Sequence, residues 1–590
     1  MESCRQSRQG DFFCLAAMLV ILAMPGKDLW AQDFERYKPK TVPAPRADIQ
    51  LPEKKEDAVS GSDDVLVPRL DAIVVLDQAD KVDPKNPNPE ATDINFYVVN
   101  PDSIIYSARA RQILESYIGQ PITLRRLNEL ARQLITFYRE CGQPIVDVQI
   151  PEQNITAGTI QLVVVESRVG QVHIHGACYS DECYLRSLVA CTRPNHLVRE
   201  SSLREDLYWL NRSPFRRVGV DFKPGVSTGT TDVLYNVEEV RAIRGYLGYE
   251  DTGVRSLALE RLLAGFIVGN VFGRDGTLGY QYTTDPKFQQ LEAHALSFNY
   301  DVNRQWSALT YASWASAAPD LPPPLNQGGE SWQTGAYLTR YLQRSSWAED
   351  SLSMGVDFKS TNNNLEFGGV NVQTSRADLF SLNLGYDLLR RYENNDYFRF
   401  VNDLYVGPGD GFSTDHTSAA FRTIRADTDP TYWYYRGFME DRSALPGCLE
   451  LVTRATGQAA SERLLFSEML GLGGADSIRG YDTRMANGDA GWIANVELGP
   501  QTRQFTRNCN SHYLRSFAFA DFGQAFINQP VVGEDPNQYL ASAGVGMRYT
   551  VANRLSLRID YGHAFEDVPG MVTNDRLHIG LVSFHGPRLK

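Results

Sequence analysis

Short segments with an apolar residue at every second position fill the C-terminal part of the chain, from about residue 239 onward. In one of them, Leu352, Met354, Val356 and Phe358 alternate with serine, glycine, aspartate and lysine. The same period returns near residue 380 and twice between residues 543 and 562. Successive side chains of a strand point to opposite faces, so each segment is predicted to be a strand with one apolar and one polar face. Helical spacing is almost absent from this region.

A soluble β-sandwich also alternates in this way, but three features favour a transmembrane β-barrel over residues 239–590. These are an export signal, recurring strands of about ten residues, and tyrosine or phenylalanine at strand ends. The tight link Val551–Arg554 contrasts with polar connections such as Ala318–Glu330, as expected for short periplasmic turns and long external loops. At about 22 residues per strand and connection, the region predicts an antiparallel barrel of about sixteen strands.

The N-terminus is predicted to be a secretory signal peptide, residues 1–31. Arg5 and Arg8 precede an apolar run from Phe12 to Met24, and Ala31 supplies a small residue for cleavage. The alternative is a membrane anchor, which needs about 20 apolar residues. Residues 32–64 are rich in proline and charge without a sustained apolar period, which indicates a flexible linker.

Two consecutive modules of the order β-α-α-β-β are predicted between the linker and the barrel. The first covers residues 65–167, where Leu127, Leu130, Leu134 and Phe137 lie at helical spacing. The second covers residues 168–238 and repeats the order of elements rather than the sequence. Small α+β sheets of this kind, with one open edge, are suited to strand addition by an extended peptide.

Composition and motifs argue against several function classes. The chain has 58 Lys and Arg against 71 Asp and Glu, a formal charge of −13, and no long basic block, so nucleic acid is not an expected partner. It contains no H-E-x-x-H and no phosphate-binding glycine loop before a lysine. The string GVSTG, Gly225–Gly229, joins two expected strands, so it is not the strand-to-helix G-x-S-x-G elbow of a serine hydrolase. His173 and His175 share one strand face, but such a pair is more often surface than metal site. We therefore expect no enzymatic activity, no cofactor and no metal.

Three motifs, in order, resemble a known family. "PEQNITAGTIQLVVVESRVG", Pro151–Gly170, resembles the junction between two POTRA modules. "SIRGY", Ser477–Tyr481, resembles a V/I-R-G-Y loop motif, and "FADFG", Phe519–Gly523, matches an F-x-D-x-G strand motif. Together with the two modules and the barrel, they resemble the outer-membrane transporters of two-partner secretion (TpsB type), the POTRA-plus-barrel proteins that export haemolysins and filamentous adhesins.

This resemblance implies a specific site. In the family, the long sixth loop folds back into the barrel lumen, here near residues 471–490, and its motif arginine pairs with the aspartate of the strand motif. Arg479 is thus expected to meet Asp521. The residues carried over are the loop motif Ser477, Ile478, Arg479, Gly480 and Tyr481 and the strand motif Phe519, Asp521 and Gly523. The alternative is that Arg479 is a solvated loop residue and Asp521 an ordinary lumen residue.

The implied function is passive translocation of a secreted partner exoprotein across the outer membrane. The modules would capture the unfolded partner in the periplasm, and a monomeric barrel in outer-membrane lipid would conduct it without nucleotide. Two alternatives stay open: a barrel-assembly factor of the same superfamily, and a passive pore or receptor. Deleting residues 65–238 separates these functions, since an exporter would lose secretion while its barrel still inserts.

Eight cysteines need separate treatment, because two leave with the signal peptide and six remain in an oxidising compartment. Cys448 and Cys509 fall in connections placed on the periplasmic side of neighbouring hairpins, which predicts a disulfide between them. Four more lie in or between the modules, and their pairing is left open: Cys141, Cys178, Cys183 and Cys191. A zinc site is the weaker alternative, because their spacing lacks a C-x-x-C pair.

Overall fold

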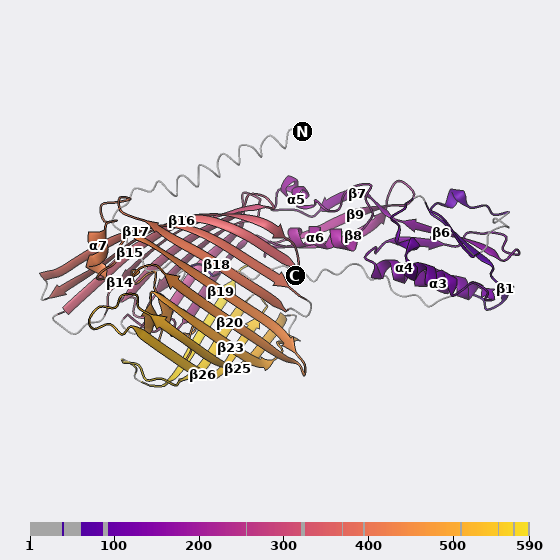
Figure 1. Ribbon diagram of the computed structural model, residues 1–590. Helices are drawn as coiled ribbons and strands as arrows, with labels where there is room; N and C mark the ends of the chain where they lie inside the picture. Colours follow the sequence, from indigo (N-terminus) through magenta and orange to yellow (C-terminus); the bar gives the residue numbers. More distant parts are fainter. Residues whose placement is uncertain are drawn as a thin grey trace. The chain divides into compact units, whose positions relative to one another are not determined.

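The computed structural model describes residues 38–40, 61–85, 93–98, 100–254, 257–319, 325–367, 370–392, 396–507, 510–552, 554–569, 571 and 573–587. The chain forms two compact units (Figure 1). One holds the N-terminal modules up to Glu239, and the other holds the chain from Val240 onward. No helix among the described residues is long and apolar enough to cross a membrane.

The first module packs two helices on a four-stranded sheet of order β3-β2-β6-β5. Its elements are β2 (Ala72–Leu76), β3 (Asp93–Tyr97), α3 (Ala108–Glu115), α4 (Leu124–Glu140), β5 (Val146–Gln149) and β6 (Thr159–Glu166). Thr123 caps the N-terminus of α4, because its side chain accepts a hydrogen bond from the Arg126 amide. The predicted apolar face of α4 is buried in the core. Strand β3 pairs in parallel with β2 and had no counterpart in the sequence-based prediction.

The second module is smaller and has a three-stranded sheet of order β7-β9-β8. Its elements are β7 (Arg168–His175), α5 (Glu182–Leu188), α6 (Glu200–Leu210), β8 (Arg216–Pro224) and β9 (Thr230–Glu239). Strand β9 lies between the other two, parallel to β7 and antiparallel to β8. This module therefore has the predicted order β-α-α-β-β, whereas the first module has β3 in addition.

A closed antiparallel barrel of sixteen strands follows, which confirms the predicted fold class. β23 and β24 pair with successive parts of β25, so together they occupy one place in the ring. The strands are β10 (Ile243–Glu250), β11 (Arg261–Val271), β12 (Gly276–Thr284), β13 (Leu291–Asp301), β14 (Trp306–Ala317), β15 (Leu325–Arg344), β16 (Ala348–Phe367), β17 (Val370–Arg391), β18 (Tyr397–Pro408), β19 (Thr431–Leu445), β20 (Leu449–Ala460), β23 (Ala490–Pro500), β24 (Arg503–Arg507), β25 (Asn510–Phe526), β26 (Asn537–Val551), β27 (Leu555–Ala564) and β28 (Asp575–His585).

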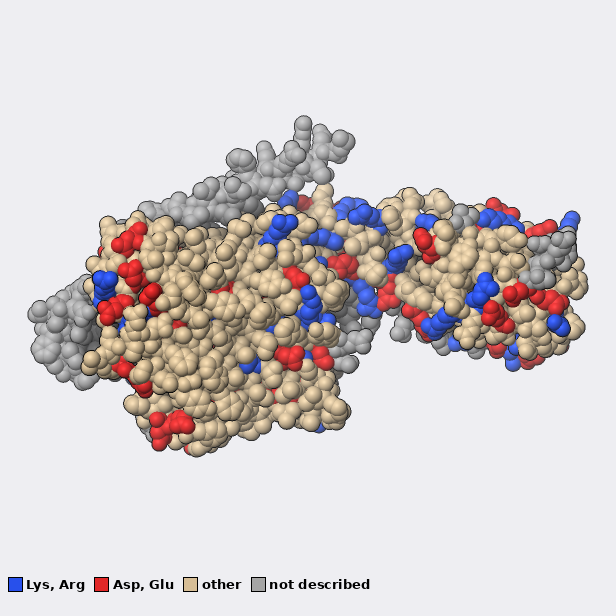
Figure 2. Space-filling model, viewed as in Figure 1, with Lys and Arg blue, Asp and Glu red and all other residues tan. Residues whose placement is uncertain are grey.

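The alternation in the sequence separates an apolar outer face from a polar lumen. On β16, Leu352 and Met354 are 47% and 56% exposed, while Asp357 is 3% exposed. Val545 on β26 and Tyr561 on β27 are likewise exposed apolar groups. In Figure 2, charged side chains are sparse over the visible part of the barrel wall. An apolar outside and a charged inside are the arrangement that lipid demands of a barrel.

One predicted connection is wrong in part. The long loop expected from Ala318 to Glu330 ends earlier, because β15 already begins at Leu325 and pairs with β16 from there. The first residues of β15 are mostly polar or glycine. Such residues form a strand when a long partner strand supplies the hydrogen bonds.

Candidate functional site

The candidate site is the connection between β20 and β23, residues 461–489, which we call the in-folded loop. It contains a small hairpin of β21 (Leu470–Leu472) and β22 (Ala486–Gly488). Its motif, Ser477–Tyr481, lies against lumen-facing residues of β23, β25, β26 and β27, which we call the latch wall. Arg479 is 3% exposed and Asp521 is fully buried. The loop is thus packed inside the barrel.

Arg479 and Asp521 form a bidentate ion pair. Arg479 Nε donates to Asp521 Oδ2 at 2.8 Å, and Nη2 donates to Oδ1 at 2.7 Å. The backbone amide of Arg479 also donates to Oδ2, at 3.0 Å. Two parallel bonds from one planar group fix both distance and orientation. Arg479 is therefore buried and paired, and the alternative that it is a solvated loop residue is wrong.

Glu497 of β23 is a second carboxylate on Arg479 that the sequence analysis did not identify. Arg479 Nη1 donates to Glu497 Oε1 at 2.7 Å. Glu497 also pairs with Arg454 at 3.0 Å and with Arg515 at 2.8 Å. A buried charge is costly unless it is paired and hydrogen-bonded, and these arginines balance the carboxylates. Glu497 lies on the polar face of a predicted strand, which is the one signal that could have found it.

Each residue of the strand motif on β25 has a separate role. The Phe519 ring centroid lies 3.7 Å from the Arg479 guanidinium carbon, so the ring stacks on the cation. Asp521 supplies the carboxylate. A Cβ on Gly523 would come within 2.7 Å of Ile478 Cδ1, so only glycine leaves room for Ile478. Asn495 of β23 completes the site by donating to the Ser477 carbonyl at 2.6 Å and to Asp521 Oδ1 at 2.8 Å.

Gly480 and Tyr481 fix the backbone of the motif. Gly480 has a φ of 104°, which favours glycine. A Cβ on Gly562 of β27 would lie 2.6 Å from the Gly480 nitrogen, so the two backbones meet through glycine on both sides. The Tyr481 hydroxyl is within 3.0 Å of the Ala541 carbonyl and accepts from the Glu566 amide at 3.1 Å. Tyr481 therefore ties the motif to β26 and to the connection after β27.

Part of the predicted linker also contacts the lumen wall. The Lys40 amide donates to the Tyr246 hydroxyl at 3.1 Å, and Lys40 Nζ pairs with Glu250 Oε1 at 2.7 Å. Pro39 is buried next to Gly279 of β12. Residues 38–40 therefore lie inside the barrel.

The expected Cys448–Cys509 disulfide does not appear. Cys448 has a free, exposed thiol, and Cys509 lies outside the described residues. Across its turn, Cys448 accepts a hydrogen bond from the Gln501 amide at 2.8 Å.

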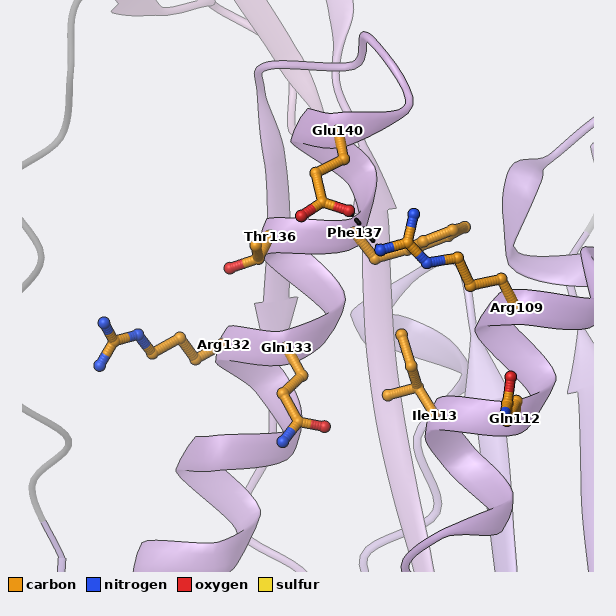
Figure 3. A pocket seen from close by; sticks show the side chains of 8 residues that line it. All are labelled: Arg109, Gln112, Ile113, Arg132, Gln133, Thr136, Phe137 and Glu140. Carbon is orange, nitrogen blue, oxygen red and sulfur yellow. Dashed lines mark hydrogen bonds and ion pairs between the residues drawn. The ribbon is translucent and has the colours of Figure 1, made fainter.

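The modules hold two further features. A groove of about 440 Å³ lies between α3 and α4, with Phe137 at its side and an Arg109–Glu140 ion pair across it (Figure 3). The rings of His173 and His175 stack at 5.8 Å on β7. Within the described ranges, no group of three or more His, Cys, Asp or Glu residues could hold a metal ion.

Comparison with known proteins shows the family. The model of the haemolysin secretion/activation proteins ShlB/FhaC/HecB matches residues 229–549, and that of the ShlB-type POTRA domain matches residues 93–167. The chain belongs to the ShlB/FhaC/HecB family. It is 22% identical to the haem/hemopexin transporter protein HuxB of Haemophilus influenzae over 464 residues, covering 76% of this chain and 79% of the relative. It is 22% identical to the outer membrane transporter CdiB of Dickeya dadantii over 461 residues, covering 76% and 78%.

Solved structures show the same fold. CdiB from Escherichia coli superposes with a TM-score of 0.58 at 16% identity, covering 94% of each chain. CdiB from Acinetobacter baumannii superposes with a TM-score of 0.53 at 13% identity, covering 98% of each chain. As a member of this family, the chain is an outer-membrane transporter for protein secretion, and its POTRA modules lie in the periplasm.

Proposed function

We propose that this chain exports one partner exoprotein, unfolded and without nucleotide, from the periplasm through its own lumen to the cell surface. Membership of the ShlB/FhaC/HecB family supports transport of a protein across the outer membrane. The in-folded loop supports passage through the lumen itself, because a loop held by side-chain contacts inside a polar channel can be displaced by a passing chain. Among the described residues, no group of three or more His, Cys, Asp or Glu side chains could hold a metal ion. The working unit in the lipid is a monomer, since the barrel closes on itself.

Strand β8 of the second module is the edge that we propose captures the partner. It is nine residues long and, in the part of the chain that the structure describes, pairs with β9 alone. Asn211 occupies its outward edge at Val218, donating to the Val218 carbonyl at 3.0 Å and accepting from its amide at 2.7 Å. By strand alternation, the amides of Val220 and Phe222 face the same outward side. An extended segment can add there.

Two variants at one position test this edge. Phe222→Pro removes the outward amide without removing a bond to β9, whereas Phe222→Thr removes the ring and keeps the amide. We expect the proline variant to lower secretion of a co-expressed partner about tenfold, while the threonine variant stays near the wild-type level. Partner protein is measured on the cell surface and in the medium. Equal loss in both variants would show that the ring, and not strand addition, matters.

Deleting residues 65–238 tests the exporter against the other two functions. An exporter loses secretion of its one partner, while its barrel still reaches the outer membrane. A general barrel-assembly factor would instead lower the level of many outer-membrane proteins. A passive pore or receptor would keep its function without the modules. The partner to use is a large exported protein encoded beside this gene.

A further inference from the structure

Glu468 connects the in-folded loop to a part of the barrel that the motif does not touch. It is 2% exposed. Lys359 of β16 donates to Glu468 Oε1 at 2.7 Å, and the Tyr434 hydroxyl of β19 donates to Oε2 at 2.6 Å. The neighbouring Ser467 hydroxyl donates to Oε1 at 3.0 Å. Both carboxylate oxygens are thus bound, and two of the donors belong to barrel strands.

Of these two strands, β16 lies across the ring from part of the latch wall, whereas β19 lies two places from β23. If β10 is the first place in the ring, and β23 with β24 counts as one, β16 is the seventh place and β27 the fifteenth. They are eight places apart in a ring of sixteen. On β27, Arg558 donates to Asp476 of the same loop at 2.5 Å. The loop therefore reaches from one side of the lumen at Glu468 to the other side at Asp476.

Apolar contacts show the same division. Up to Met469 the apolar side chains of the loop pack on β17, on β19 and on Phe421 of helix α7 (Ser418–Ile424). We call β17 and β19, together with β16, which supplies Lys359, the opposite wall. From Leu470 onward the loop packs on the latch wall. The residues on the opposite side are Leu464, Leu465 and Met469 against Ala377, Leu379, Tyr432 and Tyr434. Those on the latch side are Leu470, Leu472, Ile478 and Tyr481 against Ile493, Ala525, Leu540 and Ala564.

The two attachments differ in how much of the loop they hold. On the latch wall, backbone meets backbone through glycines, and Arg479 has an aromatic ring and three carboxylate partners, of which Asp560 at 3.7 Å is the most distant. On the opposite wall, the ends of side chains hold Glu468. Lys359 and Tyr434 bind its carboxylate, while Arg436 of β19 and Gln458 of the adjoining β20 donate to its carbonyl at 3.3 and 3.0 Å. Bonds made only by flexible side-chain ends can be broken by rotamer changes, without movement of either backbone. The opposite wall is thus the side that opens first.

We propose that Glu468, with Lys359 and Tyr434, is a second anchor that keeps the lumen closed, and that its release, with Arg479 still bound to Asp521, opens the path along the opposite wall. Glu468 is a positioning residue, since it acts by placing the loop. The anchor itself stands on the contacts above; only its release during secretion rests on the proposed function.

Channel conductance tests the anchor without any partner protein. The full chain is reconstituted in planar lipid bilayers as wild type, Glu468→Ala, Lys359→Ala, and the charge-reversed double variant Lys359→Glu with Glu468→Lys. We expect each alanine variant to raise the frequency of large openings at least fivefold, and the double variant to return toward wild type. Asp350→Asn is the matched control, because Asp350 lies on β16 and pairs with Arg390 of β17, not with the loop. Wild-type conductance in both alanine variants would overturn the anchor.

A disulfide staple tests the release. Lys359→Cys with Glu468→Cys ties the loop to the opposite wall under oxidising conditions. We expect secretion of the partner to stop and to recover on reduction. The control staple, Asp350→Cys with Arg390→Cys, joins two barrel strands and leaves secretion unchanged. If the oxidised Lys359–Glu468 staple still permits secretion, while the conductance results hold, the anchor stands and its release during export is wrong.

Discussion

The two walls that hold the in-folded loop are built from different residues. The latch wall has Gly562 where the loop backbone comes close and Gly523 where the Ile478 side chain packs, and it surrounds Arg479 with carboxylates. The opposite wall presents tyrosines, Lys359 and Arg436, which contact the loop through side-chain ends. The comparison teaches that one barrel can combine a fixed attachment with a releasable one. The variants below, ordered by expected effect, test whether the latch wall is the fixed attachment.

Removing the space for the loop should have the largest effect. Gly562→Ala puts a Cβ 2.6 Å from the Gly480 nitrogen, so the motif cannot seat and its ion pairs and hydrogen bonds are lost together. We expect the free energy of unfolding to fall by at least about 4 kcal/mol. Urea unfolding in lipid vesicles, followed by tryptophan fluorescence, measures it. Gly457→Ala is the control, because a Cβ there meets nothing within 4 Å; equal effects would contradict the close approach.

Removing the main charge partner should have the next largest effect. Asp521→Asn removes the bidentate partner and leaves Arg479 buried with Glu497 at 2.7 Å and Asp560 at 3.7 Å. We expect a loss of about 3 kcal/mol in the same unfolding measurement, since breaking a buried pair strands a charge. Asp575→Asn removes an exposed carboxylate at the start of β28 and should change little. A loss below about 1 kcal/mol at Asp521 would show that water screens the pair.

A smaller effect is expected at Tyr481. Tyr481→Phe keeps the ring but removes the hydroxyl that bonds Ala541 and Glu566. We expect a loss of about 1.5 kcal/mol, because a buried amide and carbonyl lose their partner. Amide hydrogen exchange should rise at Glu566, near the loop, and not in β16. Unchanged exchange at Glu566 would argue that the hydroxyl contributes nothing to the attachment.

The smallest effect concerns the base of the in-folded loop. Arg463 donates to both oxygens of Glu534, and this hydrogen-bonded pair lowers the pKa of Glu534 from 4.5 to about 2. A lowered folded-state pKa means that the stabilisation is complete above pH 4.5 and disappears as the pH falls toward 2. Glu534 lies in an accessible connection, so we expect about 1 kcal/mol. The loss between pH 5 and 3 should be smaller in Glu534→Gln; equal pH profiles would exclude this pair as the cause.

Local patterns predicted the barrel wall well. The segments around Leu352, Leu382 and Val545 form strands whose apolar residues face outward, since a period of two is a property of each strand alone. Helix α4 followed for the same reason, with a period of 3.6. Strand β3 and the start of β15 were not predicted, because pairing with partner strands, and not their own composition, makes them extended.

The site was only half predictable. Arg479 and Asp521 came from resemblance to a family, since nothing in their spacing of 42 residues marks them as partners. Glu497 could be placed on a polar strand face but not chosen among the other lumen charges. Lys359 and Glu468 are 109 residues apart, and they meet because the ring closes at sixteen places and the loop crosses it. Such a contact depends on the whole architecture.

Strands β15, β16 and β17 are 20 to 22 residues long, while crossing a bilayer takes about 9–11. The turn near Ser345, which joins β15 and β16, is short. The extra length of each strand therefore projects from the other end of the barrel, where the in-folded loop enters. It amounts to about ten residues, or roughly 30 Å at 3.3 Å per residue. A polypeptide leaving the mouth would thus meet a sheet overhanging one flank and open water on the other. Its first folding steps outside the cell would begin beside a surface rather than in free solution.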